Sequence, residues 1–154
     1  MPGLLEWKFS LLRLLGRRVP VRGRDRLIRF LENPGLLRDY PFVEDFHGFR
    51  YPGNLKRFID WSVYFYGAYS GHELTLLGDL ATGIRAERDG PVVAWDIGAN
   101  IGHHTLFLAS VADRVVSFEP VPHIAALLSE KLALNGIETV ALQLSALGEE
   151  AGEM

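Results

Sequence analysis

Apolar and polar residues follow two different rhythms along the chain, and the change falls near residue 90. Before it, apolar residues recur at intervals of three and four, as in "LLEWKFSLLRLL" from Leu4 onward, which is the spacing of one helix face. The pattern predicts a helical N-terminal region, interrupted by a short hairpin at "FVEDFHGFRY" with its turn at His47 and Gly48. The expected helices cover 4–16, 24–33, 54–66 and 72–82.

From Val92 onward, short apolar runs alternate with helical segments. Strands are predicted at 92–95, 114–119 and 139–144, with helices between them at 102–112 and 122–135. This βαβαβ order predicts a parallel sheet with right-handed crossovers and a ligand site beyond the carboxyl ends of the strands. We therefore expect a Rossmann-like α/β domain over 91–154, preceded by a helical region over 1–90.

Composition narrows the class of protein. The chain has 154 residues, of which 48% are hydrophobic, enough for a globular core. It has no cysteine, which excludes disulfide frameworks, thiolate zinc sites and cysteine nucleophiles and suits a cytoplasmic, reducing compartment. Glu6, Lys8 and Arg13 interrupt the leucine-rich N-terminus, so no transmembrane segment is expected.

Charge is unevenly distributed. Residues 1–60 hold 12 Lys and Arg against 7 Asp and Glu, whereas residues 61–154 hold 4 against 12. The basic half lacks the interleaved aromatic residues of RNA-binding segments, so we expect a solvated helical face and no nucleic-acid partner. The amphipathic N-terminal helix is expected to face a core or a partner, with docking on a membrane surface as the alternative.

The turn after the first predicted strand, "WDIGANIGHHT", combines an acidic residue with small turn-formers. Asp96 ends the strand, and Gly98, Asn100 and Gly102 precede a helix whose first N–H groups are exposed. Glu119 ends the second strand, 23 residues after Asp96, where Rossmann-like folds place an acid that accepts hydrogen bonds from ribose hydroxyls. The turn therefore predicts a nucleoside site.

The spacing and charge of this turn favour one nucleoside over another. Dinucleotide sites use G-x-G-x-x-G, whereas this turn reads D-x-G-x-x-x-G. Asp96 would repel a pyrophosphate but suits a ligand with ammonium and sulfonium charges. S-adenosylmethionine is therefore expected as the cofactor in preference to NAD.

These motifs resemble those of the FkbM family of S-adenosylmethionine-dependent methyltransferases. The resemblance covers about 92–152, through "WDIGANIGHHTLFLA", "VVSFEPVP", "LLSEKLALNG" and "SALGEEAG". The stretch 59–77 also resembles the segment before the fold in that family, where G-x-[YW]-E is common, although Ser70 stands here in place of the glutamate.

The resemblance implies a role for each matching residue. The methionine side of the cofactor would be lined by Asp96, Gly98, Ala99, Asn100 and Gly102. Glu119 would hold the ribose, Pro120 would shape the adenine pocket, and Ser145 and Ala146 would flank the adenine. Departures from the family pattern fall at Lys131, where asparagine is frequent, and at His103 and His104, where aromatic residues are usual.

By the same resemblance, the reaction would be O-methylation of a small-molecule or glycan hydroxyl. No residue is nominated as catalytic base, and no metal site is expected, because the adjacent His103 and His104 would diverge by about 100° on a helix. A noncatalytic nucleotide-binding or interaction module is the alternative, and an NAD-dependent dehydrogenase is the third choice. A full domain of this class has about seven strands, so the class I methyltransferase fold is expected to be incomplete here, with the acceptor site in a later part.

Overall fold

A computed structural model describes the whole chain except residues 1, 20, 33–38, 150–151 and 153–154. Its contacts divide the chain into two compact units, the first formed by Met1–Glu44 and Tyr51–Tyr69 and the second by Asp45–Arg50 and Ser70–Met154. The division at residue 90 that the sequence pattern indicates stays a prediction. None of the helices described combines the length and apolar character that a membrane crossing needs.

The first unit is built on three helices, α1 (Pro2–Arg18), α2 (Arg24–Leu31) and α3 (Phe58–Tyr66). They enclose a largely aromatic cluster that includes Phe9, Ile28 and Phe65. Phe9 makes edge-to-face contacts with Tyr64 and Phe65, with ring centroids 5.8 and 5.6 Å apart, an arrangement that aromatic quadrupoles favour. Aromatic burial therefore holds this unit together.

A buried carboxylate connects α3 to the preceding strand. Asp60 is fully buried and accepts hydrogen bonds from the Tyr51 hydroxyl at 2.8 Å, the Asn54 N–H at 2.8 Å and Arg57 Nε at 2.6 Å. Three donors, one of them cationic, compensate the loss of water around this group. The helix expected from residue 54 therefore begins only at Phe58, because Asn54 still belongs to a strand.

The predicted hairpin is confirmed. It consists of β1 (Pro41–Phe46) and β2 (Phe49–Asn54), which form a two-stranded sheet. The turn residues His47 and Gly48 have φ angles of 53° and 84°, as a two-residue turn between antiparallel strands requires. The tip of the hairpin, Asp45–Arg50, belongs to the second unit.

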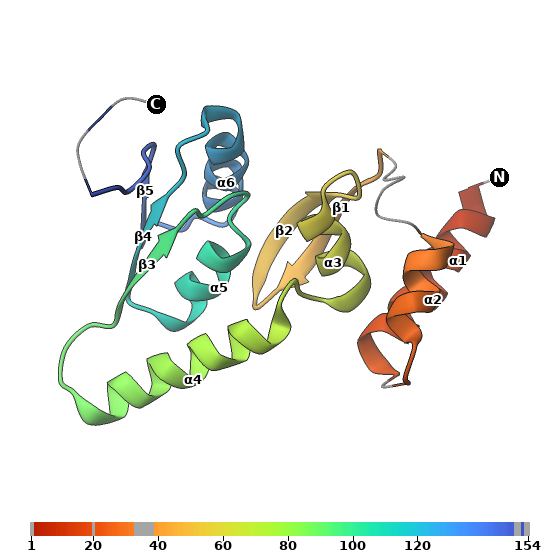
Figure 1. Cartoon of the computed structure of the whole chain (residues 1–154), viewed down its shortest axis with the longest axis horizontal. Coiled ribbons are helices and arrows are strands. Elements are labelled where there is room, and N and C mark those ends of the chain that lie inside the picture. Colours follow the sequence, from red (N-terminus) through yellow and green to blue (C-terminus); the bar gives the residue numbers. More distant parts are fainter. Residues whose placement is uncertain (1, 20, 33–38, 150–151, 153–154) are drawn as a thin grey trace. The chain divides into compact units, whose positions relative to one another are not determined.

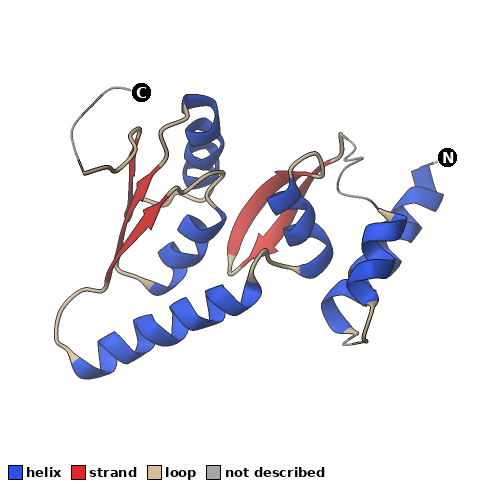
Figure 2. Cartoon of the chain, viewed as in Figure 1, coloured by secondary structure: helices blue, strands red, loops and turns tan. Residues whose placement is uncertain are grey.

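The second unit contains the predicted βαβαβ alternation (Figures 1 and 2). After α4 (Gly71–Glu87) come β3 (Val93–Ile97), α5 (His103–Val111), β4 (Arg114–Phe118), α6 (Pro122–Leu134) and β5 (Val140–Gln143). The three strands are parallel, in the order β3-β4-β5. The helix expected at 72–82 runs on to Glu87, and the other elements of this unit lie where the periodicity predicts them.

The two faces of this sheet differ. On one face, Val92, Val115 and Val140 pack with Ala81 of α4 and Leu108 of α5 in one cluster. On the other face of β3, Val93, Trp95 and Ile97 are 51, 63 and 61% exposed. β3 is also an edge strand of the sheet, so its outer edge and one of its faces are uncovered in the part of the chain that the structure describes.

Candidate functional site

The three parallel strands end side by side. Ile97 of β3 is in register with Phe118 of β4, and Phe118 is in register with Gln143 of β5. The cofactor residues expected from the sequence sit on the last residues of β3 and on the turns that follow these three ends. Ser145 and Ala146 come after β5 and are exposed. This edge of the sheet is where α/β folds place their ligands.

The turn after β3 is held against the end of β4. The N–H groups of Gly98 and Ala99 both donate to the carbonyl oxygen of Phe118, at 3.0 and 2.9 Å. The turn bends through three left-handed residues, Gly98, Asn100 and Gly102, with φ angles of 80°, 51° and 83°. Glycine and asparagine are the residues that adopt this conformation most readily, which explains the composition of the turn.

The two glycines meet different surroundings. A Cβ on Gly102 would lie 2.3 Å from Cδ1 of Leu128, whereas a Cβ on Gly98 would meet no atom of the described chain within 4 Å. Gly102 therefore permits close packing of the start of α5 against α6. At Gly98, the structural requirement is the backbone angle, and no atom of the described chain fills the space beside its Cα.

Glu119 joins two turns. Its Oε2 accepts the N–H of Asn100 at 2.9 Å, and its Oε1 accepts the N–H of Val121 at 2.9 Å. The residue is 6% exposed, and Pro120 beside it is half-buried. An ionised carboxylate has about four acceptor positions, so each oxygen keeps one for a further donor. A ribose diol, which has two O–H donors, matches this remaining capacity.

Asp96 is oriented by two residues that the sequence reasoning did not identify. Its Oδ2 accepts the Thr105 hydroxyl at 2.5 Å, and Thr105 Oγ1 lies 3.0 Å from Ser117 Oγ. Since Thr105 has one proton and donates it to Asp96, Ser117 donates to Thr105. Thr105 and Ser117 are fully buried. The available signal in the sequence was a single hydroxyl residue in each of two otherwise apolar runs, "TLFLA" and "VVSF".

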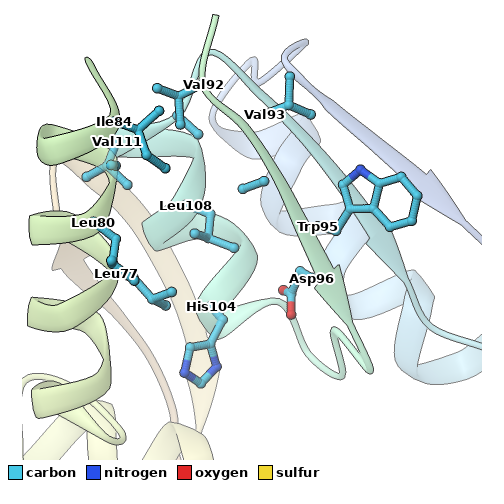
Figure 3. A pocket seen from close by; sticks show the side chains of 13 residues that line it. Leu77, Leu80, Ile84, Val92, Val93, Trp95, Asp96, His104, Leu108 and Val111 are labelled. Carbon is cyan, nitrogen blue, oxygen red and sulfur yellow. The ribbon is translucent and has the colours of Figure 1, made fainter. Parts of the chain in front are cut away.

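An apolar groove runs alongside Asp96 (Figure 3). It has a volume of about 320 Å³ and lies between α4, β3 and α5. Leucine, isoleucine, valine and alanine make up most of its lining, while Asp96 and His104 lie near one end and Trp95 projects away from the helices. Nε2 of His104 is 3.5 Å from Oε2 of Glu73 on α4. The carboxylate of Asp96, just before the turn, thus borders an apolar groove.

The two adjacent histidines of α5 occupy different environments. His103 is 2% exposed, with its ring centroid 4.8 Å from that of Phe46. Burial, together with the nearby His104, His47 and Lys131, lowers the pKa of His103 to about 3. No three His, Asp or Glu side chains gather into a metal-ion site among the described residues. His103 is therefore a neutral residue packed beneath the hairpin tip.

Asn135, expected only as a helix end, also contacts that hairpin tip. Its Oδ1 accepts the N–H of Arg50 at 2.7 Å, and its Nδ2 donates to the Arg50 carbonyl at 2.8 Å. The side-chain amide thus satisfies both backbone groups of Arg50, much as a neighbouring strand would. The end of α6 is in this way tied to a segment 85 residues away.

Comparison with protein families and with curated proteins gave no match for the chain. Among solved structures, the chain is similar to an S-adenosylmethionine-dependent methyltransferase from Agrobacterium tumefaciens, with a TM-score of 0.52 and 14% identity over 71% of this chain and 33% of that one. A Pyrococcus horikoshii protein gives a TM-score of 0.50 with 18% identity over 71% of this chain and 37% of that one. An rRNA methylase from Streptococcus thermophilus gives a TM-score of 0.41, with 23% identity over 49% of this chain and 41% of that one.

The first two of these similarities, with TM-scores of 0.52 and 0.50, identify the fold. The second unit has the first three strands and the covering helices of the Rossmann-like fold of class I methyltransferases. The chain spans roughly a third of the length of the Agrobacterium and Pyrococcus structures. The predicted cofactor, S-adenosylmethionine, is the one named for the Agrobacterium enzyme. The structure thus confirms the expected fold class, an incomplete class I methyltransferase fold.

Proposed function

We propose that the turn after β3 binds S-adenosylmethionine and that the chain is part of a methyltransferase of the FkbM type. The proposal depends chiefly on Glu119, whose buried carboxylate lies at the end of β4 and accepts the N–H of Asn100 in the turn after β3. An acceptor-only group in this place suits the two ribose hydroxyls of a nucleoside. The turn bends through three left-handed residues, and no atom of the described chain lies near the Cβ position of Gly98. The ligand could therefore contact the backbone of the turn at Gly98.

Charge supports the same ligand. Asp96 is the last but one residue of β3, and its carboxylate is oriented by Thr105. A negative charge there would attract the ammonium and sulfonium groups of S-adenosylmethionine. When bound, the cofactor would supply an electrophilic methyl group for an in-line displacement, in which an acceptor oxygen would take the methyl group, the thioether would leave and a base would take the hydroxyl proton. This chain would contribute binding and orientation to that displacement, and none of its described residues is assigned as the base.

Calorimetric titration separates the proposed cofactor from the alternatives. We expect saturable binding of S-adenosylmethionine and of its demethylated product, with much weaker binding of NAD. Tighter binding of NAD would favour a dehydrogenase and would overturn the proposal. Equal binding of adenosine and S-adenosylmethionine would favour a noncatalytic nucleotide-binding module, because Asp96 would then contribute nothing.

For the acceptor, we propose a hydroxyl group of a small molecule or glycan, on the strength of the FkbM resemblance. The test follows a labelled methyl group from S-adenosylmethionine into a panel of hydroxylated small molecules, glycans and RNA. Label in a hydroxylated small molecule or glycan supports the proposal, and label in RNA alone overturns it. Because the acceptor site is expected in a later part of the fold, cofactor binding without transfer to any acceptor is the result expected from the described strands alone and does not favour the noncatalytic alternative.

A further inference from the structure

The first unit carries an exposed apolar surface on α1 and α2. Both helices bury one side in the same aromatic cluster, α1 through Phe9 and Leu12 and α2 through Ile28. On α1, Trp7, Leu11 and Leu14 lie about half a turn from Phe9 or Leu12, and on α2 Phe30 lies about half a turn from Ile28, so these side chains point away from the cluster. Leu27 and Leu31 flank Ile28 and are also exposed. We call these exposed apolar residues of the two helices the outer face, and it consists of Trp7, Leu11, Leu14, Leu27, Phe30 and Leu31.

The outer face is strongly exposed. Phe30 is 82% exposed, Trp7 65%, and Leu11 and Leu14 about half. Lys8 joins the two helices, since its Nζ contacts the Leu31 carbonyl at 3.0 Å and Glu32 Oε1 at 2.6 Å. The apolar side chains thus belong to one connected pair of helices, and large exposed patches of this kind mark interaction sites.

Basic residues surround the outer face. Over residues 2–31 the sequence has 8 Lys and Arg against 2 Asp and Glu. Arg13 and Arg17 pair with Glu44, whereas Arg18, Arg22 and Arg26 are exposed and take part in none of the ion pairs found among the described residues. A large apolar face with a rim of free guanidinium groups is the composition of a helix that lies on an anionic bilayer.

We propose that the outer face docks on an anionic lipid surface. Trp7 and Phe30 would enter the boundary between headgroups and acyl chains, and Arg18, Arg22 and Arg26 would contact lipid phosphates. A second copy of the chain fits less well, because two outer faces would bring like charges together. Nucleic acid fits less well too, because it offers nothing apolar to cover these leucines. The proposal is independent of the cofactor site.

Vesicle flotation with the full chain tests this. We expect binding to vesicles of phosphatidylcholine mixed with phosphatidylglycerol, little binding to phosphatidylcholine alone, and release at high salt. The double variant Trp7→Ser/Phe30→Ser should lower the partition coefficient at least about tenfold, and Arg22→Gln/Arg26→Gln should weaken binding to the anionic vesicles alone. Leu76→Ser, at a leucine of α4 that is 59% exposed, is the matched control and should bind as the parent does.

Several outcomes would overturn the proposal. They are absence of binding to anionic vesicles, equal binding to neutral ones, and equal binding by the Trp7→Ser/Phe30→Ser variant. A dimer that dissociates in the Trp7→Ser/Phe30→Ser variant, from a parent chain that binds no vesicles, would also overturn it. The same holds if the chain binds RNA, and Arg22→Gln/Arg26→Gln abolishes RNA binding but leaves lipid binding unchanged. Circular dichroism checks folding, and Leu14→Ser/Leu27→Ser replaces the first variant if that variant is unfolded.

Discussion

The backbone N–H of Asn100 lies 2.9 Å from Oε2 of Glu119, so the turn after β3 and the end of β4 meet through a buried carboxylate. The second oxygen of the same group accepts the N–H of Val121. Glu119 therefore has two functions to be separated by experiment. It holds two turns together, and in our proposal it also accepts hydrogen bonds from the ribose.

We expect Glu119→Ala to weaken S-adenosylmethionine binding by about 2 to 4 kcal/mol, because hydrogen bonds to a charged acceptor are lost and two backbone donors lose their partner. Calorimetry measures the change. A 2′-deoxyribose analogue of S-adenosylmethionine isolates the ribose contact. It should bind the parent chain less tightly than S-adenosylmethionine does, whereas the Glu119→Ala variant should bind the two ligands about equally. An unchanged dissociation constant in Glu119→Ala would remove the assignment.

Gly98→Val should abolish cofactor binding. The residue has a φ of 80°, which a β-branched side chain adopts only with strain, and the new side chain would occupy the open space beside the turn. Gly83→Ala is the matched control, because Gly83 lies within α4 with nothing near its Cβ position and alanine favours a helix.

Gly90, which also lies outside the turn, is a poorer control than Gly83 because its own φ is 119°.

Gly102→Ala should lower thermal stability as well as cofactor binding, since the added Cβ would clash with Leu128. If Gly98→Val bound the cofactor normally while remaining folded, the turn would not be the binding site.

Thr105→Val should reduce S-adenosylmethionine affinity while the fold is kept. The substitution keeps the shape of the side chain but removes the hydroxyl that joins Asp96 to Ser117. Leaving a buried polar group without its partner costs about 1 to 3 kcal/mol, and Asp96 loses its orientation. Binding and urea unfolding are measured together, with Thr82→Val, an exposed threonine of α4, as the control. If Thr105→Val lowered stability but left the affinity for S-adenosylmethionine unchanged, Asp96 would not be a cofactor contact.

His103 should make folding stability dependent on pH. Its pKa is lowered to about 3 in the folded chain, mainly by burial, and is about 6.5 when unfolded. Between these values the unfolded state binds more protons, so stability falls as pH decreases from 6.5 towards 3, by up to about 1.4 kcal/mol per pH unit. His103→Phe should flatten this part of the profile in urea unfolding. Identical profiles for the two chains would contradict the lowered pKa.

The edge position of β3 should cause self-association. Val93, Trp95 and Ile97 are exposed on one face of an edge strand, and such strands pair readily with other chains. Trp95→Lys should therefore shift the chain towards monomer in light scattering at increasing concentration. Leu76→Lys, on α4, should have little effect. A parent chain that remains monomeric at every concentration would contradict this expectation.

Local pattern was sufficient for much of this protein. Apolar periodicity predicted the alternation of β3, α5, β4, α6 and β5, because the residues that specify a strand or helix lie within a few positions of one another. The hairpin was predicted in the same way, since His47 and Gly48 suit a two-residue turn. The positions of Asp96 and Glu119 at strand ends followed from the same rhythm.

Contacts between distant segments were decided by the tertiary structure alone. Nothing in the periodicity indicates that Thr105 and Ser117 orient Asp96, or that the Asn135 amide pairs with Arg50. The start of α3 at Phe58 also depends on such a contact, since Asp60 accepts the N–H of Asn54 and the Tyr51 hydroxyl. A buried polar group must find its partner wherever the packed chain supplies one, and that partner is set by how strands and helices meet in space rather than by sequence spacing.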